Sequence, residues 1–409
     1  MPPIQSKSSR IKAVYTLILI TCLFACQEKK TEDPRIKLLL GSWKRQPDPK
    51  ENSPYAPWDR EDKFFTFLSD TLVDTKQTYY EVIRSKADPR QYKFLGTTTK
   101  YTITNDTLHI YHTGRSKSKS SKQIKRITPD TLMLVNEKGK EMLYTRPVYA
   151  MDQTVIPDQI VLSSSGCFGP CPIINIIIKS TGKVIYYGEK HTEKIGFYEG
   201  QIAKEDFTKI EYEFRKANIE KLDKGYSAPW TDDEKISTTF NKDNKIINSI
   251  SDYGGSGPDE FVWAYVKLRY LYQSLDLKKM DATQLPPYQA LHYFEFQKGN
   301  KAWTLEQSES FLLWNYLKEG TKVPKRSDAR FTLNFTRNYT WFPTFDGMMT
   351  LDNITNPYNE NGKGDIDNII TDGRYYTFII NQDFVTIDIG FNFYDINKSI
   401  FREKRNIPG

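Results

Sequence analysis

Short runs of alternating apolar and polar residues dominate the chain between residues 36 and 150. Alternation with a period of two is the pattern of a β-strand that buries one face. Gly, Asp, Asn and Pro separate the runs and favour turns between them. The predicted strands are Phe64–Leu68, Tyr79–Ile83, Thr98–Ile103, Thr107–Tyr111, Gln123–Ile127, Thr131–Val135 and Met142–Arg146. Short strands at this spacing predict an all-β barrel or meander.

Strand and helix patterns alternate in a second segment, residues 155–279. A helix from Lys204 to about Ala217 places Phe207, Ile210 and Phe214 on one face, as expected of a helix that lies on a sheet. A second helix is predicted to begin at Gly257-Pro258-Asp259, because Pro and acids mark helix starts. Predicted strands are Ile160–Leu162, Ile173–Lys179, Val184–Tyr187, Ser237–Asn241 and Lys245–Ser251. This order predicts an α+β domain with a mainly antiparallel sheet.

A third segment, residues 281–409, is predicted to be another α+β domain. It contains a hairpin that turns at Gly299-Asn300, and a capping box from Thr304 to Gln307 that opens a helix. The predicted strands are His292–Phe296, Ala302–Thr304, Arg330–Phe335, Tyr375–Asn381 and Val385–Phe391. The whole chain is therefore expected to be an α+β multidomain protein with an N-terminal all-β barrel of residues 36–150.

The N-terminal residues 1–25 have the pattern of a secretory signal peptide. Basic residues precede an apolar run from Ala13 to Ala25, which is shorter than the roughly 20 residues of a membrane-spanning helix. The run ends in Leu23-Phe24-Ala25-Cys26, which resembles the lipobox of bacterial lipoproteins. This resemblance implies that Cys26 carries lipid chains, which anchor a protein durably in a membrane. Residues 26–35 would then form a lipidated tether.

The charge of the chain excludes a strongly basic, nucleic-acid-binding protein. The net charge is +7, and removal of the signal peptide, which contains Lys7, Arg10 and Lys12 but no acid, lowers it to +4. We therefore predict no nucleic-acid partner, and a membrane partner through the lipid on Cys26. The predicted location is the cell envelope, with the outer membrane favoured and the protein periplasmic or surface-exposed. Gln27 does not decide between inner and outer membrane.

Residues 36–150 resemble a known domain type. Leu40-Gly41-Ser42-Trp43, followed by a strand meander, is similar to the lipocalin-like domains of Bacteroidota lipoproteins. The resemblance implies that Trp43 closes the barrel floor. It leaves two alternatives for the interior, which either holds a small apolar ligand or is filled by its own side chains.

Cys167 and Cys171 are the cysteines of the second segment, in Cys167-Phe168-Gly169-Pro170-Cys171-Pro172. An exported protein folds in an oxidising compartment, so a disulfide is the first interpretation of this pair. The motif and the order of elements around it resemble a bacterial family of unknown function that is common in Bacteroidota. That resemblance brings no catalytic residues with it.

A second interpretation of the same cysteines remains open. Cys-x-x-x-Cys-Pro also resembles the motif of thioredoxin-fold copper chaperones, whose thiolates bind a soft metal. In that fold a helix follows the motif and lowers the thiol pKa. The β-branched residues of Ile173–Lys179 predict a strand instead.

The sequence contains no recognised catalytic arrangement. HExxH, P-loop and dinucleotide-binding patterns do not occur, and only four histidines are present. We predict no catalytic residue, no metal and no cofactor. Trp58 and Trp230 lie in Pro-Trp loops beside acids and are candidate contacts for a glycan or an envelope protein. The predicted function is a lipid-anchored envelope protein that acts as a non-catalytic binding or structural module, and the alternative is a copper-binding or redox protein that uses Cys167 and Cys171.

Overall fold

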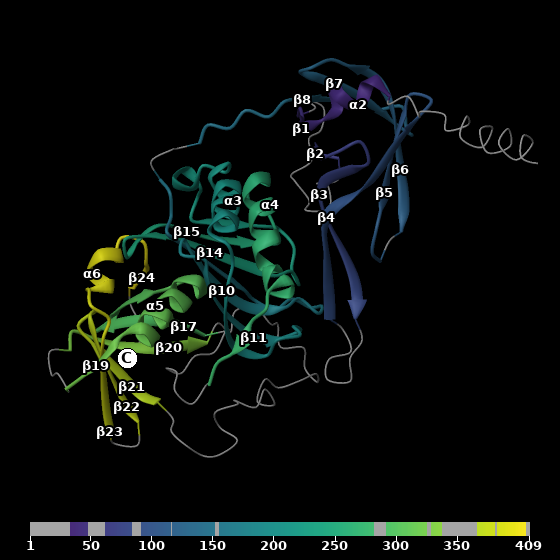
Figure 1. Cartoon of the computed structure of the whole chain (residues 1–409). Coiled ribbons are helices and arrows are strands. Elements are labelled where there is room, and N and C mark those ends of the chain that lie inside the picture. The colour runs from purple at the N-terminus through teal and green to yellow at the C-terminus, as the bar shows by residue number, and fades with distance from the viewer. Residues whose placement is uncertain are drawn as a thin grey trace, which may run out of the picture.

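The structure is a computed structural model in which the chain forms three units (Figure 1). The first is a closed barrel of eight antiparallel strands, and the other two are eight-stranded sheets with helices. This arrangement confirms the predicted α+β multidomain fold with an N-terminal barrel. The described residues are 33–47, 62–83, 91–115, 117–151, 155–281, 292–324, 329–337, 366–380 and 383–405.

The barrel closes where its first strand pairs with its last, with Lys44 opposite Thr145. Its interior is filled from alternate positions of each strand, which explains the period of two in the sequence. The strands β3, β4 and β6 are longer than predicted, and α2 and β1 were not assigned from the sequence. The elements are α2 (Pro34–Leu39), β1 (Gly41–Arg45), β2 (Phe64–Phe67), β3 (Leu72–Ile83), β4 (Gln91–Thr104), β5 (Thr107–His112), β6 (Ser118–Ile127), β7 (Thr131–Asn136) and β8 (Glu141–Thr145).

The long hairpin β3–β4 extends from the barrel to the central unit (Figure 1). Near its far end, Tyr80 and Phe94 pack on Tyr270, with ring centroids 5.6 and 4.9 Å away. The side chain of Gln273 accepts a hydrogen bond from the backbone N–H of Phe94 and donates one to the carbonyl of Tyr92, both at 2.9 Å. The hairpin therefore fixes the barrel against the central unit.

The central unit is a sheet with the strand order β13-β15-β14-β9-β10-β11-β12-β16. Its helices α3 and α4 pack together, and their apolar side chains join the core on one face of the sheet. Helix α3 begins at Lys204, as predicted, and α4 begins directly after Pro258. The elements are β9 (Gln159–Ser164), β10 (Ile173–Lys179), β11 (Lys183–Lys190), β12 (Gly196–Gln201), α3 (Lys204–Arg215), η2 (Ile219–Lys221), β13 (Gly225–Ser227), β14 (Lys235–Lys242), β15 (Lys245–Tyr253), α4 (Asp259–Arg269), η3 (Leu271–Ser274) and β16 (Lys278–Lys279).

The C-terminal unit is a sheet with the order β19-β23-β22-β21-β20-β17-β18-β24. The predicted hairpin is present as β17 and β18. No helix in the described part of the chain has the length and apolar character needed to cross a membrane. The elements are β17 (His292–Lys298), β18 (Lys301–Thr304), α5 (Gln307–Glu319), β19 (Thr321–Val323), β20 (Phe331–Arg337), β21 (Ile366–Thr371), β22 (Tyr375–Ile380), β23 (Asp383–Asp388), α6 (Phe393–Asn397) and β24 (Arg402–Arg405).

Helix α5 joins the central and C-terminal units into one core. It contacts β9, β10 and β14 of the central sheet and β17 of its own sheet (Figure 1). Trp314 stacks on Phe197 of the central sheet with ring centroids 4.6 Å apart. The capping box of α5 is formed by Glu306 and Glu309 rather than by Thr304 and Gln307. The predicted cap was wrong by two positions, because the Thr304 hydroxyl donates to Glu295 across the hairpin instead.

Candidate functional site

One part of the barrel interior is a packed apolar core. Trp43 is completely buried there, and its indole N–H donates to the carbonyl of Leu39 at 2.7 Å. The guanidinium of Arg146 lies 3.6 Å from the centre of the Trp43 ring. Of the two alternatives for the interior, this packing fits the filled one. The buried members of this core are Leu39, Trp43, Phe65, Phe67, Val73, Tyr101, Leu108, Ile110, Ile124, Leu132, Leu134, Met142 and Tyr144.

Other buried positions of the barrel are polar and hydrogen-bonded. The hydroxyl of Tyr79 lies 3.1 Å from the Thr75 hydroxyl and 3.2 Å from Nδ1 of His112. Lys122 is buried and forms an ion pair of 2.9 Å with Asp62. Lys122 lies within β6, where it is buried on the same face as Ile124, so the interior of the barrel takes up one of the positive charges of this strand.

Cys167 and Cys171 form a disulfide, with their Cα atoms 5.6 Å apart. Strand β10 begins at Ile173, directly after Pro172, so the helix that a thioredoxin-type metal motif requires is replaced by a strand. The backbone N–H of Phe168 donates to the carbonyl of Asp232 at 3.1 Å, while the Phe168 side chain is 86% exposed. The disulfide loop is thus attached to the neighbouring loop of Trp230.

The predicted contact residue Trp230 packs back onto the protein. It is half-buried, and its indole N–H donates to Asp233 at 3.2 Å. A Cβ atom at Gly254 would come within 3.0 Å of the indole nitrogen, so the ring covers the turn at Gly254. Trp58 and the lipidation residue Cys26 lie outside the described residues. Trp230 therefore acts as a lid on its own domain.

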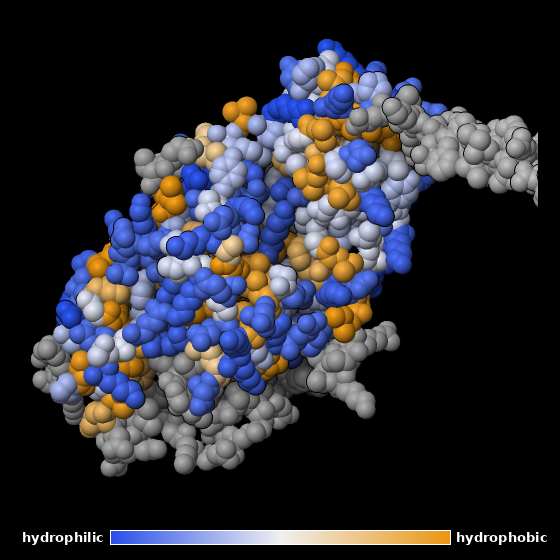
Figure 2. Space-filling view, viewed as in Figure 1, coloured by the Kyte–Doolittle hydropathy of each residue, from blue (hydrophilic) through white to orange (hydrophobic). Residues whose placement is uncertain are grey.

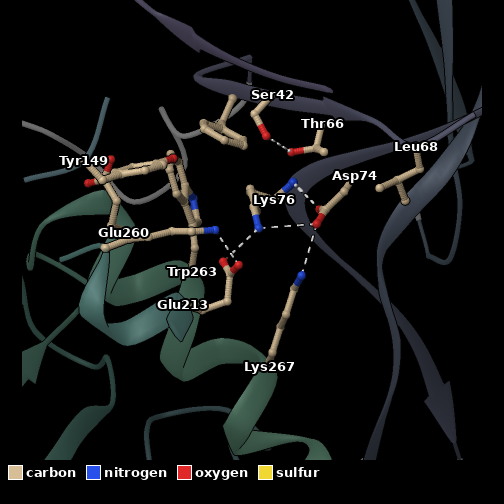
Figure 3. A pocket seen from close by; sticks show the side chains of 12 residues that line it. Ser42, Thr66, Leu68, Asp74, Lys76, Tyr149, Glu213, Glu260, Trp263 and Lys267 are labelled. Atoms are coloured by element: carbon tan, nitrogen blue, oxygen red, sulfur yellow. Dashed lines mark hydrogen bonds and ion pairs between the residues drawn. The ribbon is translucent and has the colours of Figure 1, made fainter. Parts of the chain in front are cut away.

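A pocket of about 210 Å³ lies between the barrel and helices α3 and α4 (Figure 3). Barrel strands provide one wall, and the two helices provide the other. Charged residues of both signs face this space together with three aromatic rings. The lining residues are Ser42, Phe64, Thr66, Leu68, Asp74, Lys76, Tyr149, Glu213, Lys216, Glu260, Trp263 and Lys267.

A bulge in β3 aims Lys76 into the pocket. The pairing of β3 with β4 shifts register between Asp74 and Tyr79, and Lys76 has φ +58°, a left-handed conformation that a lysine rarely adopts. The carboxylate of Asp74 accepts the backbone N–H of Lys76 at 3.0 Å and holds the bulge. In a regular strand the side chains of residues 74 and 76 would run parallel to each other, whereas the bulge brings the Lys76 ammonium within 3.4 Å of the Asp74 carboxylate.

Four charged groups at the pocket form a connected network (Figure 3). Lys76 lies 3.4 Å from both Asp74 and Glu213, and Lys267 lies 3.0 Å from Asp74. Burial pushes the pKa of Asp74 upward, but the two ammonium groups outweigh burial and hold it well below its usual range. Burial pushes the pKa of Lys76 downward, and its two carboxylates reverse this and raise it. Asp74 and Lys76 therefore both stay charged around neutral pH.

Ion pairs across the pocket fasten the barrel to the central unit. The Lys76–Glu213 and Lys267–Asp74 pairs both join the two units. Two further pairs do the same on the side of Glu260, namely Lys44–Glu260 and Lys63–Asp259, the latter at 3.6 Å. The pocket therefore exists only where both units are present.

Trp263 provides a hydrogen-bond donor that has no partner among the described residues. Its ring lies 5.0 Å from that of Phe64, and its side chain is 6% exposed. Nε1 is buried without a hydrogen bond. A buried unpaired N–H is costly, and such groups in native proteins call for an explanation.

Lys76 does not have the properties of a lysine nucleophile. A lysine nucleophile needs a depressed pKa, whereas the pKa of Lys76 is raised. Within the described part of the chain, no group of His, Cys, Asp and Glu is arranged to hold a metal ion. Sequence reasoning missed this pocket, because its residues come from distant segments and have no common spacing.

Comparison with known proteins assigns the central unit. Residues 158–272 match the family described as Domain of unknown function (DUF6438). Neither the curated proteins nor the solved structures contain a match to the chain. The matched segment contains the pocket residues Glu213, Glu260, Trp263 and Lys267, while Asp74 and Lys76 come from the barrel. The chain therefore carries a DUF6438 domain at residues 158–272, preceded by an eight-stranded antiparallel β-barrel.

Proposed function

We propose that this chain is a lipid-anchored protein of the bacterial cell envelope, held in the outer membrane, that acts as a non-catalytic binding module. The lipobox-like Leu23-Phe24-Ala25-Cys26 supports the anchor. The observation that carries the binding role is the pocket built jointly by the barrel and the DUF6438 domain. Its lining includes Trp263, whose indole N–H is buried and has no hydrogen-bond partner among the described residues.

The surface supports the pocket as the binding site. On the face in Figure 2, hydrophobic residues form separate patches among hydrophilic ones. A continuous apolar surface would favour a flat protein interface. Scattered patches are ordinary for a protein surface, so the chemically defined pocket between the two units is the more specific candidate.

The anchor would place the barrel nearest to the membrane. Six residues separate Cys26 from Asp33, the N-cap of α2, and this stretch reaches at most about 25 Å when fully extended. Helix α2 lies at the end of the barrel that is remote from the C-terminal sheet (Figure 1). The barrel would then act as a base, with the DUF6438 domain and the C-terminal sheet further from the bilayer.

The anchor is tested by Cys26→Ala. The expected result is that the variant leaves the membrane fraction and no longer incorporates labelled fatty acid, because the acylated thiol is lost. Cys22→Ala is the matched control, since Cys22 lies in the signal peptide that would be removed, and it should fractionate like the native protein. Membrane retention of the Cys26→Ala protein without fatty acid would contradict the anchor.

The binding role is tested by ligand-observed NMR with a library of small molecules on the mature chain. We expect at least one class to bind the native protein and to lose binding in Lys267→Gln, whose half-exposed side chain makes misfolding a small risk. A reproducible hydrolase or transferase activity of the purified chain would contradict the non-catalytic part of the proposal.

A further inference from the structure

We infer that the pocket between the barrel and the DUF6438 domain takes a small organic molecule with a single carboxylate. This inference rests on the proposed binding function and names the chemistry of its ligand. Three independent properties of the pocket lead to it, namely the balance of donors and acceptors, the balance of charge, and the size and character of the walls.

The acceptors of the pocket already have partners. Both oxygens of Asp74 are engaged, one by the backbone N–H of Lys76 and the other by the Lys267 ammonium, each at 3.0 Å. Both oxygens of Glu213 are engaged by lysines, at 2.5 Å by Lys216 and at 3.4 Å by Lys76. Glu260 accepts from Lys44. A ligand that offers only donors would therefore share these oxygens with the lysines that already donate to them.

The donors of the pocket are in excess. An ammonium group has three N–H donors. Lys76 divides its donors between two carboxylates at 3.4 Å, near the limit of a hydrogen bond, and Lys267 has a single carboxylate partner among its hydrogen bonds in the described residues. The indole N–H of Trp263 is unpaired. The complementary ligand group is one that accepts several hydrogen bonds, and a carboxylate provides about four acceptor sites.

The charge balance selects a monoanion. Lys76, Lys216 and Lys267 line the pocket with Asp74, Glu213 and Glu260. Lys44 neutralises Glu260 from outside the lining, so four ammonium groups face three carboxylates and one positive charge remains. One ligand carboxylate balances that charge. A phosphate group, with about 1.5 to 2 negative charges at neutral pH, would leave net negative charge beside Glu213 and Glu260.

The size and walls of the pocket limit the body of the ligand. A volume of about 210 Å³ lies below the range typical of sites for drug-sized ligands. Phe64 from the barrel and Trp263 from α4 form a tilted aromatic pair, and Tyr149 contributes a third ring. These rings suit a small planar or short apolar group attached to the carboxylate.

The test is calorimetric titration of the full mature chain with sodium benzoate, with benzyl alcohol and inorganic phosphate as matched probes. We expect benzoate to bind at least about tenfold more tightly than either of the other two. Trp263→Phe keeps the ring but removes the N–H, and Lys267→Gln removes one ammonium. Each should weaken benzoate about tenfold, the loss expected for one hydrogen bond to a charged group.

Lys209→Gln is the matched control variant. Lys209 lies on the same helix as Glu213 but is highly exposed and outside the pocket, so its variant should bind benzoate like the native chain. The indole N–H resonance that disappears in Trp263→Phe should shift when benzoate is added to the native chain. A structural role of Trp263 alone would leave that resonance unmoved, and circular dichroism establishes that each variant is folded.

The outcomes separate this inference from the proposed function. Benzoate that binds equally to the native chain and both pocket variants would overturn the carboxylate site. Phosphate or a neutral molecule that binds more tightly than benzoate, with sensitivity to Lys267→Gln, would also overturn it while leaving the binding module intact. If nothing binds in a way that depends on Trp263 or Lys267, the binding module fails too, whereas the anchoring result with Cys26→Ala stands apart from all of these.

Discussion

Asp74→Asn is the most informative single change, because Asp74 is the carboxylate on which the bulge and two lysines converge. Asn is nearly isosteric and keeps an oxygen for the backbone N–H of Lys76, so the bulge retains its hydrogen bond. What the substitution removes is the negative charge between Lys76 and Lys267.

The expected loss of stability follows from the surroundings of each lysine. Removing one partner of a buried ion pair costs about 3–5 kcal/mol. Lys267 is 41% exposed at its side chain and turns to water, and Lys76 retains Glu213, so the cost lies below that range. We expect Asp74→Asn to lower the free energy of unfolding by about 2 kcal/mol at pH 7.

The effect should also depend on pH. The pKa of Asp74 in the folded protein lies well below its value of 3.8 in the unfolded chain, so the carboxylate stabilises the fold above about pH 4. This contribution is lost progressively as the pH falls from there through the folded pKa. The difference between the native chain and Asp74→Asn should therefore be constant from pH 5 to 7 and shrink below pH 4.

The assay is urea unfolding of both chains at a series of pH values. Asp206→Asn is the matched control, because Asp206 pairs with Lys209 on the exposed surface of α3 and its loss should cost less than about 0.5 kcal/mol. If Asp74→Asn costs no more than Asp206→Asn, or costs as much at pH 3 as at pH 7, the network at the pocket does not hold the two units as argued.

Three further predictions concern the rest of the fold. Gly182→Ala should destabilise the protein much more than Gly139→Ala. Both glycines have positive φ, but a Cβ at Gly182 would overlap the carbonyl of Ile202, whereas Gly139 faces open space. Thermal unfolding should show a loss of roughly 1 kcal/mol at Gly139, from the conformational cost alone, and a larger loss at Gly182. Burial and the nearby Glu306 raise the pKa of Glu309 to about 7. The contribution of Glu309 to the stability of the folded protein is therefore complete below pH 4.5 and is lost as the pH rises to about 7. Glu309→Gln should remove this pH dependence of the unfolding free energy while keeping the capping box. Replacing Cys167 and Cys171 together by Ser should lower the free energy of unfolding by about 2 kcal/mol, the chain-entropy value for so small a loop. Mass spectrometry of the unreduced native chain should find both cysteines blocked to alkylation. Free thiols with bound copper would restore the metal alternative.

Local sequence signals were sufficient where one segment determines its own structure. Strand β10 has the predicted bounds because Ile173 and Ile177 face the core shared with α5, whereas Ile174, Ile176 and Ile178 face the core under α3 and α4. A strand buried on both faces reads as a continuous apolar run, which the sequence displays directly. The helix α3 is equally clear, because its apolar side chains lie on one face only.

Tertiary context determined what the sequence did not reveal. Helix α5 buries Ser308, Ser310 and Asn315 as well as its apolar residues, because it lies between two sheets. An amphipathic pattern cannot indicate such a double burial. The hydroxyl of Ser308 lies 2.7 Å from that of Thr239 in the central sheet, a partner about 70 residues away. The pocket residues are a stronger case, since Lys76 acquires its position from a bulge and its partners from helices of another domain.

The location of the pocket bears on how a DUF6438 domain obtains a function. The matched segment supplies Glu213, Lys216, Trp263 and Lys267, while the barrel adds Lys76 beside Glu213, Asp74 beside Lys267 and the other wall of the pocket. On its own the domain would expose Glu213 and Lys267 to water, where charges are screened and bind ligands feebly. The barrel covers part of these groups and pairs them with Asp74 and Lys76. The chemistry of the site therefore belongs to the pair of units, and the same domain joined to a different neighbour would present a different pocket.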